Sequence, residues 1–381
     1  AQQAVTVFNA GARIMLRKNV WTMHILGLGM LAIITLAACS GGGSPSSASG
    51  PGATADKTAA PGAAPGTGAK WVIGMSQCNL GEPWRVQMNK DLEEAAKAHP
   101  EIRMIFKDAQ NDTTIQQNHV REFISQGINL LIISPKEAAP LTGPVAEAYR
   151  KGIPVIVLDR ALLGEDFTMF IGADNRAIGE AAGRWIRQTL GGRGKVVELM
   201  GLQTSVPGHD RHDGFMKGIE GSEIEIIFQA DMKWLQPDAQ KEMESALARF
   251  PKIDLVYAHN DPGAYGAYLA AKAAGREKEM KFVGIDALPH EGIAYVKQGI
   301  LSATFEYPTG GKEAIEYALR ILKGEQGLPK KVVLPSRLFT AENVDRGGEV
   351  IPMEGVTEPA TSNPSAPAPE TPATNGASTK P

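Results

Sequence analysis

The sequence has only two cysteines, Cys39 and Cys78, in 381 residues, so a framework of several disulfides is excluded. Aromatic residues are also few, at 6%. Lysine plus arginine (39) nearly balance aspartate plus glutamate (42), and the net charge is −3. Because no long-range field of one sign draws the whole molecule toward nucleic acid, we expect no nucleic-acid partner. The hydrophobic fraction of 43% is nevertheless sufficient for two domains of ordinary size.

The apolar stretch at about 25–36 is too short for a comfortable membrane span. It follows Arg17 and Lys18 and ends in Leu36-Ala37-Ala38-Cys39. This pattern resembles a bacterial lipoprotein signal peptide, in which a basic start precedes a short apolar core and a cysteine that takes the lipid. The resemblance implies that residues 1–38 are upstream residues plus signal peptide, with the true start at Met15. The alternative is a buried helix that ends in a cysteine by chance.

Two segments are too poor in apolar residues to fold. Residues 39–69 combine the predicted lipidated Cys39 with a Gly/Ser/Pro/Ala tether, and residues 352–381 are rich in Pro, Ala, Thr and Ser. Such segments cannot bury enough surface to offset their ordering entropy, so we expect a disordered tether and a disordered tail. With Cys39 lipidated, Cys78 has no partner and is either a small buried side chain or a reactive thiol.

Short apolar, β-branched runs recur between about 70 and 345, separated by amphipathic stretches of helical length. They are Trp71–Met75, Met104–Phe106, Leu130–Ile133, Pro154–Leu158, Met169–Ile171, Val196–Leu199, Ile224–Ile227, Leu255–Tyr257, Phe282–Ile285 and Ala303–Phe305. Strands that alternate with helices indicate right-handed βαβ units and parallel sheets covered on both faces. The sequence therefore predicts a doubly wound α/β architecture, twice over.

In doubly wound sheets ligands bind outside the carboxyl ends of the strands, so the residues just after each apolar run are informative. Nearly every run is followed by a carboxylate, an amide or a cation. Asp112, Asp174 and Asp261 are better explained as N-caps of the following helices. Asp159 and Arg160 fit the ligand position better, because both charges follow a wholly apolar strand.

The run Pro154–Arg160 followed by Ile171–Asn175 resembles the sugar-binding periplasmic proteins of the ribose-binding class. The strings Val256–Asp261 and Val283–Asp286 resemble later strand ends of that family. Trp84-Arg85 and Tyr257–Asp261 are most similar to its galactofuranose-binding branch. The resemblance spans about 70–339, in the family's order.

The resemblance implies a type I periplasmic binding protein fold, with two doubly wound parallel-sheet lobes joined by three crossover strands. The first lobe would contain residues 70–172 and 304–328, and the second 173–303 and 329–345. A strand near Val332 to Leu334 would return to the second lobe.

The resemblance also implies a ligand site between the lobes. The residues carried over to it are Glu82, Trp84, Arg85, Asp159, Arg160, Arg211, Trp234, Asn260, Asp286 and Glu306. Planar carboxylates, amides and guanidinium groups match vicinal hydroxyls, while aromatic faces cover C–H patches. Trp84 and Trp234 would stack on the sugar, although aromatics at strand ends are as often part of the core.

Charged residues leave the identity of the ligand open. Glu82 stands where ribose-specific members carry an amide, and with Arg85 and Lys136 it makes the pocket more charged than a simple aldopentose site. A furanose, a pyranose, a sugar acid, an amino sugar and an inositol are all compatible with these residues.

Other motifs carry less weight. His209-Asp210-Arg211-His212-Asp213 could suggest a metal site, but Arg211 as a ligand contact explains the segment better. Gly191-Gly192-Arg193-Gly194 precedes a strand, so it indicates a helix stop and not a dinucleotide site. We expect no catalytic residues, no metal and no cofactor.

The sequence predicts an extracytoplasmic, lipid-anchored binding protein that captures a sugar or polyol for the permease of an ABC importer. The alternative is a sensory module that presents its ligand to a membrane receptor or sensor kinase. A sugar-responsive repressor is excluded, because a secretion signal stands where a helix-turn-helix would be required.

Overall fold

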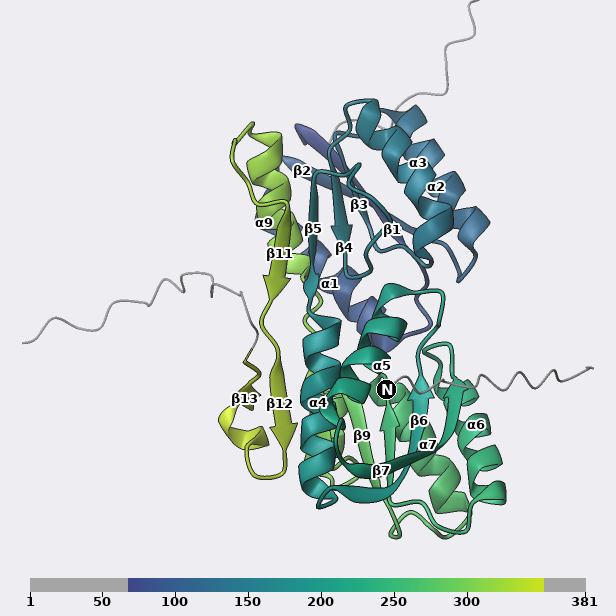
Figure 1. Cartoon of the computed structure of the whole chain (residues 1–381). Coiled ribbons are helices and arrows are strands. Elements are labelled where there is room, and N and C mark those ends of the chain that lie inside the picture. The colour runs from purple at the N-terminus through teal and green to yellow at the C-terminus, as the bar shows by residue number, and fades with distance from the viewer. Residues whose placement is uncertain (1–67, 353–381) are drawn as a thin grey trace, which may run out of the picture. The chain divides into compact units, whose positions relative to one another are not determined.

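The computed structural model describes residues 68–352. Met15, Cys39, the signal peptide, the tether up to residue 67 and the tail after residue 352 lie outside the described residues. The described chain forms two sheets, each with its own helices, which we call the first and second lobes (Figure 1). No helix in residues 68–352 is both long and apolar enough to cross a membrane.

The first lobe has a six-stranded sheet in the order β11-β5-β4-β3-β1-β2, and every neighbouring pair is parallel. Its strands are β1 (Trp71–Gln77), β2 (Ile102–Asp108), β3 (Leu130–Ile133), β4 (Val155–Leu158), β5 (Met169–Ala173) and β11 (Lys331–Leu334). Its helices are α1 (Pro83–Lys97), α2 (Thr113–Gln126), α3 (Ala138–Arg150) and α9 (Gly311–Leu322). Figure 1 shows α2 and α3 packed together on one side of this sheet.

Strand β3 is apolar throughout because both of its faces are buried. Leu130 and Ile132 belong to one buried cluster, which includes residues of α1 and α9. Leu131 and Ile133 point to the opposite face and join a second cluster with residues of α2 and α3. Because successive side chains of a strand alternate between faces, a strand covered on both faces must be apolar at every position.

The second lobe has a seven-stranded sheet in the order β13-β12-β10-β9-β8-β6-β7, in which only the pairs β10–β12 and β12–β13 are antiparallel. Its strands are β6 (Arg193–Met200), β7 (Glu223–Asp231), β8 (Leu255–Ala258), β9 (Lys281–Asp286), β10 (Ala303–Glu306), β12 (Arg337–Thr340) and β13 (Glu349–Val350). Its helices are α4 (Asn175–Thr189), α5 (Val206–Gly218), α6 (Gln236–Arg249), α7 (Asp261–Ala273), α8 (Gly292–Lys297) and the 3-10 helix η1 (Val344–Arg346).

Helices α4 and α5 pack closely because glycines face each other at their contact. A Cβ atom on Gly179 of α4 would lie 2.3 Å from the carbonyl oxygen of Arg211 in α5. A Cβ atom on Gly214 of α5 would lie 2.1 Å from the carbonyl oxygen of Arg176 in α4. Any larger residue would push the helices apart, so these glycines set the position of the helix that carries Arg211.

The chain passes between the lobes at three places, which follow β5, β10 and β11. The first passage is where the sequence predicted it, near Ile171 to Asp174. The other two differ from the predicted boundaries. β10 pairs with β9, so residues 304–306 belong to the second lobe and not to the first.

Strand β11 was predicted to return to the second lobe, and this prediction was wrong. β11 pairs in parallel with β5, with Val332 opposite Ile171, and so extends the first sheet (Figure 1). Its last residue, Leu334, is buried in the core beside α9. The strand that enters the second sheet is β12, where Phe339 lies opposite Thr304.

Candidate functional site

A small pocket lies between the two lobes, at the carboxyl ends of their parallel strands. Its lining residues are Glu82, Trp84, Arg85, Asp159, Arg160, Pro207, Arg211, Trp234, Asn260, Asp286 and Tyr307. The structure thus brings together nine of the ten candidate ligand residues that the sequence indicated. Glu306 is absent from the lining, whereas Pro207 and Tyr307 are additions.

Asp159, directly after β4, is the centre of the first-lobe half of the site. Its Oδ2 accepts hydrogen bonds from Arg85 Nη2 at 3.1 Å and Ser134 Oγ at 2.9 Å. Its Oδ1 accepts one from the Tyr307 hydroxyl at 2.8 Å. Burial alone would raise the pKa of Asp159, but Arg85, Arg160 and these hydrogen bonds hold that pKa below its usual value. Asp159 is therefore a buried, fixed carboxylate.

The charges of Glu82 and Arg85 satisfy each other. Arg85 Nε donates to Glu82 Oε1 at 3.2 Å, and Arg85 Nη1 donates to Gln77 and Ser134. Both residues are buried. Arg85 is shared between the carboxylates of Glu82 and Asp159, and Arg160 lies 3.9 Å from Asp159, so two guanidinium groups balance two carboxylates in this half of the site.

Tyr307 connects the crossover after β10 to both halves of the site, and it is only 3% exposed. Besides donating to Asp159, its hydroxyl accepts a hydrogen bond from Asn175 Nδ2 at 3.2 Å. Its carbonyl oxygen accepts one from Trp84 Nε1 at 2.7 Å, and the two rings lie 5.1 Å apart. Trp84 is thus held by the crossover, with its indole N–H already bonded within the protein.

Arg211 of α5 is the corresponding cation in the second lobe. Its Nε donates to Asn175 Oδ1 at 2.9 Å, and its Nη1 donates to the carbonyl oxygen of His259. Its Cζ lies 4.4 Å from the ring centroid of Tyr307 and 5.2 Å from that of Trp234. Such cation–π contacts fix the plane of the guanidinium group.

The ring of Trp234 makes a cation–π contact with one arginine from each lobe. Arg160 of the first lobe lies with its Cζ 5.6 Å from the Trp234 ring centroid, facing the same ring as Arg211. Arg160 Nε and Trp234 Nε1 are buried and have no hydrogen-bond partner in the described part of the chain. Buried donors of this kind need an acceptor, and both belong to residues that line the pocket.

Asn260 contributes by holding the backbone next to the pocket. Its Oδ1 accepts from the backbone N–H of Gly263 and so caps α7. Its Nδ2 donates to the carbonyl oxygen of Trp234 at 3.0 Å. The amide therefore has one N–H left for a ligand.

Asp286, at the end of β9, differs from Asp159 in its electrostatics. Burial raises the pKa of Asp286 well above its usual value, with Arg211 opposing this shift and Asp261 adding to it. Burial also raises the pKa of Asp261, whose carboxylate accepts from Thr304 Oγ1 and from the backbone N–H of Ala287. Asp286 is therefore a carboxyl that retains its proton more readily, able both to donate and to accept.

Backbone strain is concentrated at the pocket. Positive φ angles occur at Asp159 (72°), Trp234 (70°) and Asp286 (135°), and at the neighbouring Lys233 (54°) and Ala287 (54°). These residues have side chains that disfavour this region, so the surrounding structure must hold them there. Such strain is typical of functional sites, and the amino-acid sequence gives no sign of it.

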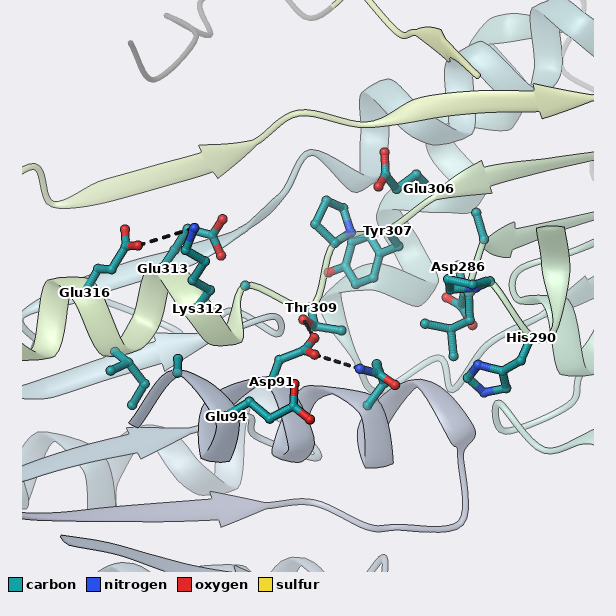
Figure 2. A pocket seen from close by; sticks show the side chains of 18 of the residues that line it. Asp91, Glu94, Asp286, His290, Glu306, Tyr307, Thr309, Lys312, Glu313 and Glu316 are labelled. Atoms are coloured by element: carbon teal, nitrogen blue, oxygen red, sulfur yellow. Dashed lines mark hydrogen bonds and ion pairs between the residues drawn. The ribbon is translucent and has the colours of Figure 1, made fainter. Parts of the chain in front are cut away.

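Glu306 lies beside the pocket without lining it. Figure 2 shows Glu306 and Tyr307 pointing away from the crossover segment in opposite directions. The Glu306 side chain is 34% exposed, and its carboxylate lies 3.9 Å from Arg337 Nε. It belongs to a second cavity of about 710 Å³, which also includes Asp91 and Glu313.

The helix-cap predictions had mixed outcomes. Asp112 and Asp174 accept hydrogen bonds from the first turns of α2 and α4, as predicted. The prediction for Asp261 was wrong, because Asn260 is the N-cap of α7 and Asp261 is buried inside its first turn. Cys78 is a free, buried thiol whose pKa burial raises.

The histidines near Arg211 are not grouped as in a metal site. His212 bonds to Glu198 of β6, and no cluster of three or more metal-ligating side chains was found in residues 68–352. His290 is exposed.

Two parallel-sheet lobes with a polar, tryptophan-lined pocket between their strand ends define a two-lobed binding protein for a small polar molecule. A model of the periplasmic binding protein domain family matches residues 73–326. The chain therefore belongs to this family, as the resemblance in its strand ends had predicted.

Individual relatives agree with this assignment. The chain is 31% identical to the ribose import binding protein of Bacillus subtilis, over 71% of this chain and 88% of that protein. It is 29% identical to the galactofuranose-binding protein of Escherichia coli, over 69% of this chain and 85% of that protein. A solved structure, the fructose binding periplasmic domain of a hybrid two component system, is 44% identical with a TM-score of 0.70, over 72% of this chain and 92% of that one.

Proposed function

We propose that this protein is the substrate-binding component of an ABC importer and that it captures a monosaccharide or related polyol between its lobes. The observation that carries this proposal is the pocket itself, in which both lobes present charged, planar groups and tryptophans to one small space. Its relatives include proteins named as a ribose import binding protein and a galactofuranose-binding protein. These names support a binding role without catalysis.

The chemistry of the pocket suits hydroxyl groups. Each sugar hydroxyl donates one hydrogen bond and accepts others, so its binding site must offer both an acceptor and donors. Asp159 supplies a fixed acceptor, while Arg160 and Trp234 supply buried donors that have no partner within the described chain. Trp84 and Trp234 add aromatic surface for the C–H faces of a sugar.

We further propose that the ligand is a neutral sugar. In the first-lobe half of the pocket the guanidinium groups of Arg85 and Arg160 pair with the carboxylates of Glu82 and Asp159, so this half leaves no net charge for a ligand to balance. The relatives named for ribose, galactofuranose and fructose bind neutral sugars. Fructose and sugars that form furanose rings are therefore the first candidates, ahead of sugar acids and amino sugars.

Ligand capture would couple to closure of the lobes. A ligand favours the closed arrangement only to the extent that it contacts both lobes at once. Asp159 and Arg160 lie on the first lobe, whereas Arg211, Asn260 and Asp286 lie on the second. A sugar that bonds to both sets would hold the lobes together and present a closed protein to the permease.

The test is direct calorimetry of the full-length chain, purified in detergent, against fructose, ribose, arabinose, galactose, myo-inositol, glucuronate and glucosamine. Saturable binding of a neutral sugar supports the proposal. Absence of binding across the panel rejects the sugar function, and preference for glucuronate or glucosamine rejects the neutral ligand.

We also propose that Cys39 carries a lipid that holds the protein on the outer side of a bacterial membrane. The sequence pattern before Cys39 supports this. Metabolic labelling with a fatty acid should mark the wild type and not Cys39→Ala. Equal labelling of both proteins would reject the anchor.

A sensory module is the second candidate, because the 44% identical structure is part of a hybrid two component system. Deletion of the gene separates the two functions. Loss of sugar uptake indicates the importer, whereas intact uptake with loss of a transcriptional response to sugar indicates the sensor.

A further inference from the structure

Glu198 of β6 is a charged residue in a strand that is otherwise apolar where it is buried, and it is 0% exposed. It does not line the pocket. Burying a carboxylate is costly unless hydrogen bonds and charges compensate it, so such a residue needs an explanation beyond core packing.

Three side chains from three different elements compensate Glu198. Gln229 of β7 donates to Oε2 at 2.7 Å. The ring nitrogens His212 Nδ1, from α5, and His259 Nε2, just after β8, each lie 3.0 Å from Oε1. Because a carboxylate only accepts, both histidines must donate. Burial would raise the pKa of Glu198, but the bonds from His212 and His259 lower it to about 2.

The proton of His259 is placed by its surroundings. Its Nδ1 accepts from the backbone N–H of Gly201 at 3.2 Å, so the ring proton is on Nε2 and points to Glu198. Burial lowers the pKa of His259, which keeps its ring neutral, while the hydrogen bond to Glu198 raises the pKa of His212. Asp213 and Arg211 of α5 and Tyr257 of β8 are the other ionisable groups near this cluster.

Glu198 is thereby connected to Arg211 by two routes. His259, whose ring bonds to Glu198, offers its carbonyl oxygen to Arg211 Nη1. His212, the second histidine whose ring bonds to Glu198, directly follows Arg211 in α5. One buried carboxylate thus fixes both the helix that carries the guanidinium and the backbone oxygen that receives it.

We propose that Glu198 is a positioning residue for Arg211, holding its guanidinium at the pocket through His259 and His212. This inference rests on the proposed sugar-binding function for its effect on affinity. Its effect on Arg211 itself does not depend on any ligand.

The test is a double-mutant cycle on the full-length chain, with sugar affinity measured for wild type, Glu198→Gln, Arg211→Lys and the double variant. Glu198→Gln keeps the side-chain shape, but its amide N–H₂ meets a donor where the carboxylate accepted one. We expect a loss of about tenfold in affinity in the wild-type background and less than about twofold beside Arg211→Lys. Equal losses in both backgrounds, or no loss in either, would overturn the proposal.

A second readout needs no sugar. The NMR resonance of Arg211 Nε–H should shift or broaden in Glu198→Gln, and an unchanged resonance would contradict the positioning role. If the wild type binds none of the sugars, the proposed function fails while this readout still decides whether Glu198 positions Arg211.

The matched control is Asp254→Asn, at the opposite end of β8. Asp254 Oδ2 accepts from the backbone N–H of Lys195, at the other end of β6, and so ties the same two strands together far from Arg211. It should leave both the affinity and the Arg211 resonance unchanged. If Glu198→Gln does not fold, His212→Gln replaces it, because His212 is partly exposed and its loss removes only one of the two routes.

Discussion

Each lobe supplies one buried aspartate to the pocket, Asp159 from the first and Asp286 from the second, and the surrounding residues bias their charges in opposite directions. Asp159 accepts hydrogen bonds from Arg85, Ser134 and Tyr307, and its pKa is held down. Asp286 is buried near Asp261, and its pKa is raised. The same side chain is a fixed acceptor in one lobe and a donor and acceptor in the other.

This difference shows how a neutral ligand can be held on both sides. A carboxylate with a full set of partners is already oriented, so it adds affinity without an ordering cost. A carboxyl that keeps its proton has fewer fixed bonds and can adapt to whichever hydroxyl reaches it. The first lobe is therefore the more strongly preorganised half of the site.

Asp159→Asn should have the largest effect. The amide accepts at one oxygen only, and the buried Arg85 loses one of its two carboxylate partners, which costs about 3 kcal/mol. We expect sugar affinity to fall by at least about a hundredfold, measured by calorimetry, and the melting temperature to fall as well. A loss below tenfold would mean that Asp159 is not the fixed acceptor of the site.

Tyr307→Phe should have the next largest effect, because it removes one donor from Asp159 and leaves the ring in place. We expect a loss of about 1 kcal/mol, roughly fivefold in the dissociation constant. The pKa of Asp159 should rise, so the affinity of the variant should fall at a higher pH than that of the wild type when the solution is acidified. Tyr268→Phe, in α7 away from the pocket, is the control. An equal effect of both variants would remove the special role of Tyr307.

Asp286→Asn applies the same chemical change to the other lobe and should do much less to affinity. An asparagine donates and accepts, as a protonated carboxyl does, so we expect a loss of only about threefold. Stability should change in the opposite direction to Asp159→Asn. The variant should be more stable than the wild type by about 1 kcal/mol at pH 8 and equally stable at pH 4.

The sign of that pH dependence follows from the raised pKa of Asp286. Above about pH 4 the unfolded chain ionises this group, whereas the folded chain keeps the proton until a higher pH. The wild type therefore loses stability as pH rises between the two pKa values, and asparagine does not. Thermal unfolding at both pH values measures this. Equal stability of the two proteins at pH 8 would contradict the raised pKa.

Much of this arrangement could be predicted from the sequence. Asp159 and Arg160 follow an apolar run that is buried on both faces, and in a parallel sheet the residue after such a run reaches the ligand edge. The same rule draws attention to Asn260 and Asp286, and the family resemblance then assigned both to the site.

What the sequence did not predict depends either on a shift of a single residue or on contacts between residues that are far apart in sequence. Asn260 and Asp261 are both good N-caps, and only the three-dimensional start of α7 decides between them. The opposite pKa shifts of Asp159 and Asp286 depend on residues that are distant in sequence, such as Arg85, 74 positions before Asp159. Neither the composition nor the spacing of the sequence contains that information.

Glu306→Gln should have the smallest effect, and it tests which face of the crossover belongs to the site. Adjacent residues of an extended segment point to opposite sides, so a shift of one position exchanges the residue that lines the pocket. Tyr307 lines it, whereas the Glu306 carboxylate is partly exposed and lies near Arg337. Affinity should therefore change by less than about twofold, since exposed ion pairs contribute little. A loss of tenfold or more would place Glu306 on the ligand, as the sequence had predicted, and would give the second lobe a second carboxyl in the pocket.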